Sequence, residues 1–154
     1  MKVLDRKVFN EELGALLKRA EDLIPNEVLP DLPYGEWHSF ELELWQIGET
    51  IRQFVAENGR KFNADQIERI LNICLDKKAG RGRQSFVLLL GRKMYSTYAG
   101  CVVRILDDTD VDGQVIDTLY KMCAGQYVEL VTLFLDHDKT WIGNLAKKYV
   151  QKYR

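Results

Sequence analysis

The stretch Leu135–Tyr149, LDHDKTWIGNLAKKY, contains the pattern on which the fold prediction depends. It has the acidic end of one helix, a short polar link, and the start of a second helix with apolar residues at helical spacing. The Leu-Asp pair at its beginning recurs upstream at Leu75-Asp76 and Leu106-Asp107, so the three pairs stand 31 and 29 residues apart. A period of about 30 residues is typical of stacked helical units.

The residues before each of these three aspartates match as well. Five positions before them stand Leu71, Val102 and Val131. The residues two positions before them are also apolar, namely Cys74, Ile105 and Phe134. Because one helix pair cannot bury its apolar stripe alone, successive pairs are expected to stack and share a core.

The distribution of proline predicts a helical body. Pro25, Pro30 and Pro33 fall within nine residues, and the next 121 residues contain no proline. Proline disrupts helix interiors, so its absence favours helix after this joint. No segment alternates with the period of two that a half-buried strand shows. The predicted helices span 10–24, 39–58, 63–75 with its cap, 83–94, 98–107, 111–123, 126–136 and 140–152.

Several helix ends carry local signals. Asn10, followed by two glutamates, is expected to start the first helix. Asn58-Gly59 is expected to end the second helix. Asn63 is the clearest start, because Gln66 stands three residues later and can complete a capping box.

The repeat resembles the HEAT-like helical repeat family over roughly residues 64–153. In that family a helix ends near an aspartate, and the next helix begins with an apolar residue and has alanine four positions later. Ile142 and Ala146 fit this pattern, whereas Gly143 stands where the family usually has arginine. The resemblance implies a scaffold for recognition, since such repeats mostly bind other molecules.

These observations predict an all-α fold, arranged as a short HEAT-like α-solenoid of about three helix pairs plus an N-terminal helix. The whole chain, 1–154, is interpreted as a single domain. It divides into the N-terminal helix 10–24, a proline-containing joint 25–38 and a repeat body 39–154. An irregular helical bundle with a chance similarity is the alternative.

Composition excludes several classes of protein. Hydrophobic residues make up 46 % and charged residues 29 %, an ordinary globular balance. The net charge of −1 gives no global field that would attract nucleic acid or a membrane. No apolar run reaches the ~18 residues of a membrane span, and the N-terminus lacks the apolar core of a signal peptide. Cys74, Cys101 and Cys123 are interpreted as buried thiols, so we expect a cytoplasmic protein without membrane association.

Motifs with known catalytic chemistry are missing from the sequence. It has no H-E-x-x-H, C-x-x-C or G-x-S-x-G. Asp108–Gly113, DTDVDG, matches the first half of an EF-hand loop, but its twelfth position, which should be a bidentate glutamate, is Leu119. We interpret it as an acidic link in which Asp110 caps the next helix. We therefore expect no enzymatic activity, no metal and no cofactor.

Charge is strongly segregated along the chain. Between Asp76 and Asp107 lie 30 residues that contain seven bases and no acid, and acids are concentrated directly after them. The candidate basic patch consists of Lys77, Lys78, Arg81, Arg83, Arg92 and Lys93. In a solenoid the second helices of successive pairs line one face, so their polar residues are available to a partner. This candidate partner surface consists of Arg69, Asn72, Asp76, Arg104, Asp107, Asp108, Asp112, Glu129, Thr132 and Asp136.

The leading functional hypothesis is a non-catalytic module that binds another protein. Within this class, a small scaffold or an immunity-type inhibitor that masks a basic partner fits the size and the acidic residues. The alternative is a nucleic-acid-binding or DNA-processing helical-repeat protein that uses the basic segment 77–104.

Overall fold

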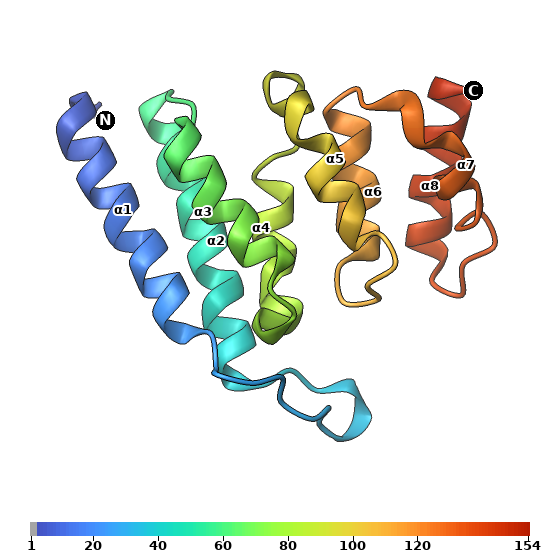
Figure 1. Cartoon of the computed structure of the whole chain (residues 1–154), viewed down its shortest axis with the longest axis horizontal. Coiled ribbons are helices and arrows are strands. Elements are labelled where there is room, and N and C mark those ends of the chain that lie inside the picture. The colour runs from blue at the N-terminus through green and yellow to red at the C-terminus, as the bar shows by residue number, and fades with distance from the viewer. Residues whose placement is uncertain (1–2) are drawn as a thin grey trace. The chain divides into compact units, whose positions relative to one another are not determined.

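The computed structural model describes residues 3–154, and this part of the chain is 72 % helical and contains no strand (Figure 1). The prediction of an all-α fold is therefore confirmed. The chain packs as two compact units, which we call unit 1, ending at Phe86, and unit 2, Val87–Arg154. The interpretation of the whole chain as one domain stays a prediction, and each unit is described by itself.

Unit 1 is built on three long helices. They are α1 (Arg6–Leu23), α2 (Ser39–Asn58) and α3 (Ala64–Leu75). A run of 3₁₀ turns, η2 (Lys77–Arg83), follows α3, and α4 (Gln84–Leu88) contains the division between the units. α2 packs against both α1 and η2, and α3 packs against the same two elements.

The ends of these helices follow the local signals, with one exception. α2 ends at Asn58, before Gly59 at a φ of 60°, as predicted. Asn63 and Gln66 form the predicted capping box, in which each side chain accepts the other's backbone N–H. α1 begins at Arg6 rather than near Asn10, because the Asp5 carboxylate accepts the Val8 N–H at 3.0 Å and caps the helix four residues earlier.

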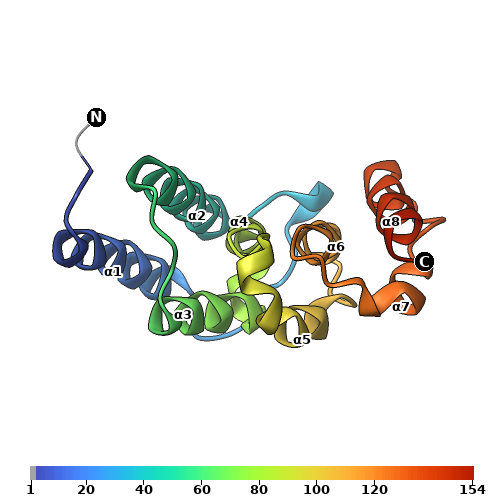
Figure 2. The same ribbon diagram turned by 90° about the horizontal axis from the view of Figure 1, so that it is seen from above.

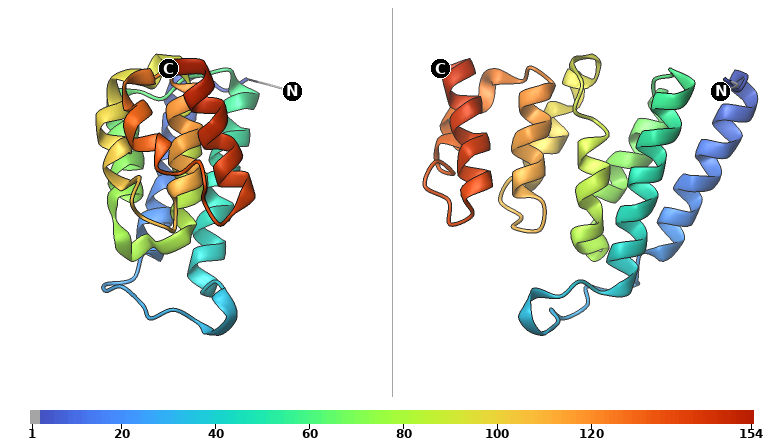
Figure 3. Two further views of the ribbon diagram at one scale, coloured as in Figure 1. Left: turned by 90° about the vertical axis from the view of Figure 1, so that its right-hand side faces the viewer. Right: turned by 180° about the vertical axis from the view of Figure 1, so that it is seen from behind.

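The proline-containing joint is extended, with one 3₁₀ turn, η1 (Pro33–Gly35), and it runs beyond the ends of α1 and α2 (Figure 3). It is held in place by hydrogen bonds. The His38 Nε2 lies 2.8 Å from the Pro30 carbonyl, and the Arg81 side chain bonds the carbonyls of Gly35 and Glu36. The joint is therefore a fixed part of unit 1.

Unit 2 has two rows of short helices (Figure 2). One row contains α6 (Asp112–Lys121) and α8 (Thr140–Tyr153). The other contains α5 (Ala99–Val102) with its 3₁₀ continuation η4 (Val103–Ile105), and α7 (Val128–Thr132). The 3₁₀ turns η3 (Lys93–Tyr98) and η5 (Gly125–Tyr127) precede α5 and α7, and α8 packs against both α6 and α7.

Three predicted helices are shorter in the structure. The helix predicted for 83–94 is α4, and it ends in turns before Arg92, whose φ of −142° and ψ of 146° are extended. The helices predicted for 98–107 and 126–136 are each replaced by a short α-helix with 3₁₀ turns. Apolar spacing at i+3 suits a 3₁₀ turn as well as an α-helix, so the pattern alone did not separate them.

The apolar residues five positions before each repeated aspartate are buried. Leu71, Val102 and Val131 are 8 %, 2 % and 0 % exposed. The fully buried Tyr149 on α8 also donates its hydroxyl to the Ala124 carbonyl and accepts the Tyr127 N–H at 3.1 Å. Unit 2 thus has an apolar core and, through the Tyr149 hydroxyl, hydrogen bonds that join α8 to η5 and to Ala124 directly before it.

Candidate functional site

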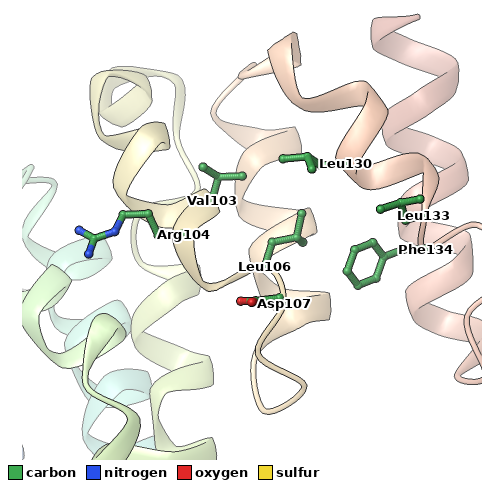
Figure 4. A pocket seen from close by; sticks show the side chains of 7 residues that line it. All are labelled: Val103, Arg104, Leu106, Asp107, Leu130, Leu133 and Phe134. Atoms are coloured by element: carbon green, nitrogen blue, oxygen red, sulfur yellow. The ribbon is translucent and has the colours of Figure 1, made fainter.

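A groove on unit 2 lies between the α5–η4 segment and α7 (Figure 4). It has a volume of about 440 Å³. We call it the unit 2 groove, and its lining consists of Val103, Arg104, Leu106, Asp107, Leu130, Leu133 and Phe134. The lining is mostly apolar, with one basic and one acidic side chain.

Two leucines at the groove are unusually exposed. Leu133 is 79 % exposed and Leu130 is 47 % exposed. The cause is local. The short helix α7 turns Val131 into the core, and this leaves Leu130 before it and Leu133 directly after the helix facing outward. Neighbouring exposed apolar side chains that line a groove are typical of an interaction surface.

Part of the predicted partner surface lies at this groove. Arg104 and Asp107 are exposed and belong to its lining. Glu129 on α7 and Asp136 in the following link are also exposed. Thr132 is half-buried, and its hydroxyl donates to the Val128 carbonyl at 2.7 Å. The structure therefore brings Arg104 and Asp107 together with the exposed leucines of α7.

Asp112 is not part of any exposed surface, so its assignment to the partner surface is wrong. It is 5 % exposed and accepts the Gly113 N–H at 2.8 Å. Its second oxygen lies 3.3 Å from Nε2 of His137. The residue stands in the first turn of α6, where the helix dipole favours a carboxylate, and its role is to hold the 136–139 link to α6.

The acidic link before α6 also differs from the prediction. The position capping α6 is Val111, which offers no side-chain hydrogen bond, so Asp110 is not the helix cap. The half-buried Asp108 instead accepts the Asp110 N–H at 3.0 Å and shapes the turn. The second half of the EF-hand-like segment is the helix α6 itself, which leaves no room for a calcium loop.

Three predicted surface residues lie in unit 1. Arg69 forms a two-point ion pair with Glu21, with an N–O distance of 2.6 Å, and so joins α3 to α1. Asn72 is exposed. Asp76 accepts the Lys78 N–H at 3.0 Å and caps η2. Of the three, Arg69 and Asp76 stabilise unit 1 through these bonds.

Among the residues of the predicted basic patch, Arg83 differs most from the prediction. It is 0 % exposed, so its assignment to a basic surface is wrong. The guanidinium donates to the Gly80 carbonyl at 2.7 Å and to the Cys74 carbonyl at 3.3 Å. These bonds satisfy the carbonyls where α3 ends and η2 turns, which is a structural role.

Arg81 also acts inside unit 1. Its side chain donates to the carbonyls of Gly35 and Glu36 at 2.7 and 2.6 Å and lies over the Trp37 ring. Its backbone N–H and its Nε face the buried Glu41 carboxylate, at 2.6 and 3.6 Å. Arg81 therefore fixes the proline-containing joint to η2.

The remaining basic residues are divided between the two units. Lys77 is exposed and Lys78 lies 3.8 Å from Asp76 in unit 1. Arg92 and Lys93 are exposed in unit 2. The basic segment of the sequence is thus not a basic surface of one unit.

The two histidines make structural hydrogen bonds. Nδ1 of His137 accepts the Lys139 N–H at 2.9 Å, so Nε2 carries the proton directed at Asp112. His38 bonds Pro30 through Nε2 and, through its backbone N–H, Glu41. With both of its ring nitrogens engaged, His137 lacks the free nitrogen that a general base uses. Within residues 3–154, no three His, Cys, Asp or Glu side chains are grouped to hold a metal ion.

The three cysteines have different environments, which corrects the expectation that all are buried. Cys74 is buried, Cys101 is half-buried and Cys123 is exposed at a φ of 60°. Cys123 follows the end of α6, where the chain turns into η5. Burial raises the pKa of the Cys74 thiol to about 12.

These differences predict an order of alkylation. At a pH of about 8 the Cys74 thiol is protonated in the folded protein, and the thiolate is the reactive form. Cys123 is therefore expected to react with iodoacetamide first, Cys101 more slowly, and Cys74 only when unit 1 opens. Mass spectrometry of timed samples measures the order, and labelling of Cys74 at the rate of Cys123 would contradict it.

Sequence reasoning missed Leu130 and Leu133, because it assigned apolar side chains at helical spacing to the core. A signal was present in the sequence. The buried position of this segment, Val131, belongs to the stripe matched between repeats, and the two leucines lie outside that stripe but three residues apart. Residues three apart share one face of a helical turn.

In comparisons with family models, curated proteins and solved structures, no match to this chain was found. The HEAT-like resemblance therefore stays a prediction. No helix within residues 3–154 has both the length and the apolar character needed to cross a membrane.

Proposed function

We propose that this chain is a non-catalytic protein-binding module of the HEAT-like solenoid class, which binds its partner through the unit 2 groove. The observation that carries the proposal is the exposure of Leu130 and Leu133 beside Arg104 and Asp107 in one groove. A groove that combines apolar anchors with a charged rim is typical of protein recognition.

The solenoid part of the proposal is supported by unit 2. The α5–η4 segment and α7 occupy equivalent places in two successive helix pairs, and their matched residues Val102 and Val131 are both buried. α6 and α8, the other helices of these pairs, pack against each other. Stacked pairs of this kind leave the surface of one row free for a partner.

The charge around the groove indicates the kind of partner. Asp107 lines it, and the exposed Glu129 and Asp136 lie on and after α7. Arg104 is the one basic residue in the lining. Asp107 in the apolar groove, with the exposed acids Glu129 and Asp136 on and after α7, favours a protein segment with apolar side chains and neighbouring lysine or arginine residues. This is the chemistry that an inhibitor masking a basic partner requires.

Nucleic-acid binding has less support. Arg83 is buried and Arg81 is bound to the joint, so two of the six residues of the candidate basic patch are engaged inside the fold. The groove lining carries one acid and one base, so it has no net positive charge that would attract phosphate. A cytoplasmic location is part of the proposal, because three free thiols suit a reducing compartment.

Replacing both leucines by serine tests the proposed site. Leu130→Ser with Leu133→Ser is expected to weaken the affinity for a partner captured by the wild-type protein by roughly 30-fold or more, as loss of central apolar anchors does. The melting temperature should change little, because Leu133 is largely solvated and Leu130 is about half exposed in the free protein. Affinity is measured by calorimetry or surface binding with the isolated partner.

Two controls separate this site from other surfaces. Met94→Ser removes an apolar side chain that is 49 % exposed in unit 2 but does not line the groove, and it should leave the affinity unchanged. Asp107→Asn with Asp136→Asn should slow association and reduce its dependence on salt. If the leucine variant binds as the wild type does, the groove is not the binding site. If instead a short DNA duplex binds with a steep salt dependence, the nucleic-acid alternative is favoured.

A further inference from the structure

A second groove lies on unit 1 and is independent of the proposed site. It is formed by the end of the proline-containing joint and the first half of α2, and its lining consists of Glu36, Trp37, Leu42 and Trp45. Its volume is about 560 Å³, and Leu42 is 56 % exposed. We call it the unit 1 groove. Two half-buried tryptophans and an exposed leucine give it an aromatic and apolar lining.

The stretch of sequence that supplies the groove residues carries charge of a single sign. The 32 residues from Ala20 to Ile51 contain eight acids and no lysine or arginine. Four of these acids, Glu21, Asp22, Glu41 and Glu49, form ion pairs with bases outside this stretch. The other four are exposed and form no ion pair with any residue of 3–154, namely Glu27, Asp31, Glu36 and Glu43.

The unit 1 groove already recognises one guanidinium group. Arg81 lies over the ring of Trp37, with its Cζ 5.2 Å from the ring centroid, and donates to the carbonyls of Gly35 and Glu36. A planar guanidinium stacks on an indole ring more favourably than the compact ammonium of lysine does. The ring of Trp45 has no cation over it within the described residues.

The turn beside the groove presents another aromatic side chain. Tyr34 has a φ of 60° and a ψ of 22°, a left-handed conformation that a bulky residue rarely adopts. Its side chain is 99 % exposed, so no packing inside the fold offsets the strain. Strain of this kind at an exposed aromatic residue is typical of a binding surface.

From these observations we propose that the unit 1 groove binds an arginine-containing segment of another protein, with an arginine on Trp45 and an apolar neighbour against Leu42. Glu36 in the lining supplies complementary charge at the groove, and the exposed Glu27, Asp31 and Glu43 add to the negative charge of the same stretch of chain. Because these acids carry negative charge, an anionic membrane and a nucleic acid are both disfavoured as occupants.

The test uses a short synthetic peptide in which arginine and leucine alternate, and a control peptide in which citrulline replaces each arginine. Citrulline keeps the shape of the side chain and removes its charge. The indole N–H signals of Trp37, Trp45 and Trp141 are followed by NMR during the titration. Trp141 is 48 % exposed in unit 2 and is the internal control.

The arginine peptide is expected to shift the Trp45 and Trp37 signals and to leave that of Trp141 unchanged. The citrulline peptide should bind about tenfold more weakly, through loss of the cation–π and ionic contacts. Leu42→Ser should weaken the binding of the arginine peptide about fivefold, as the loss of an exposed apolar contact does. Leu133→Ser, the matched change in the unit 2 groove, should leave the shifts of Trp37 and Trp45 unchanged.

Three results would overturn the proposal. The Trp37 and Trp45 signals could stay unshifted at millimolar peptide, the citrulline peptide could bind equally well, or all three indole signals could shift together. Because the readout belongs to tryptophans of unit 1, these results are distinct from a failure of the unit 2 groove, which the loss of binding to the captured partner measures.

Discussion

Gly80→Ala is expected to destabilise unit 1 by about 3 kcal/mol or more. Gly80 has a φ of 58° and a ψ of −144°, a conformation essentially restricted to glycine. A Cβ at this position would lie 2.5 Å from Oε2 of Glu41. Glu41 is 4 % exposed, and its carboxylate accepts the N–H groups of Arg81 and His38, so it cannot move away without leaving a buried charge unpaired.

A second glycine gives the matched control. Gly59 has a φ of 60°, but a Cβ at Gly59 would meet nothing within 4 Å. Gly59→Ala should therefore lose only the conformational part, about 1 kcal/mol. Urea unfolding of both variants measures the difference in the free energy of unfolding. Equal losses would show that the contact with Glu41 is not tight, whereas partial recovery in Gly80→Ala with Glu41→Ala would show that the two residues are coupled.

Close approach also accounts for other glycines in this region, including Gly82 in the segment Ala79–Arg83, AGRGR. A Cβ at Gly82 would lie 2.8 Å from Leu44, and one at Gly48 would lie 2.0 Å from the Ser85 oxygen. Glycines on both α2 and the segment after α3 thus let two stretches of backbone pack against each other. The glycines and basic residues of this segment are visible in the sequence, but the sequence did not indicate that the glycines would pack against α2.

The sequence predicted long elements well and short ones poorly. α2 spans the predicted 39–58, because both its stripe and its glycine stop are strong. α8 begins at the predicted Thr140, because its apolar stripe starts directly after this residue. Between Gln84 and Thr132 the helices span at most ten residues and are interrupted by 3₁₀ turns. Tertiary packing decides between α and 3₁₀ geometry in pieces of that length.

The candidate site was predicted in part for a related reason. Arg104 and Asp107 were predicted to be exposed because they lie two and five residues after the buried Val102, away from the buried stripe, and both line the unit 2 groove. The exposed leucines could not be found by a rule that places every apolar side chain of a repeat in the core. Asp112 was misplaced because a carboxylate in a first helical turn can be buried when a histidine reaches it.

Arg83→Met is expected to lower the stability of unit 1 by roughly 2–4 kcal/mol. The methionine would fill most of the space but leave the Gly80 and Cys74 carbonyls without the donor they now have. A buried acceptor that loses its partner costs more than the net value of the hydrogen bond. Arg83→Lys should recover only part of the loss, because an ammonium cannot reproduce the planar fork that reaches both carbonyls.

Lys77→Met is the matched control, because it removes the same charge from the same segment at an exposed position. Its effect should stay within about 0.5 kcal/mol. Alkylation of Cys74, whose carbonyl bonds Arg83, adds a local measurement, since its rate should rise in Arg83→Met and not in Lys77→Met. If the two variants had the same stability, Arg83 would be a surface base, and the nucleic-acid alternative would regain one of its contacts. The predicted difference in stability between the two variants instead means that a basic stretch of sequence indicates a basic surface only when its buried arginines and lysines are left out.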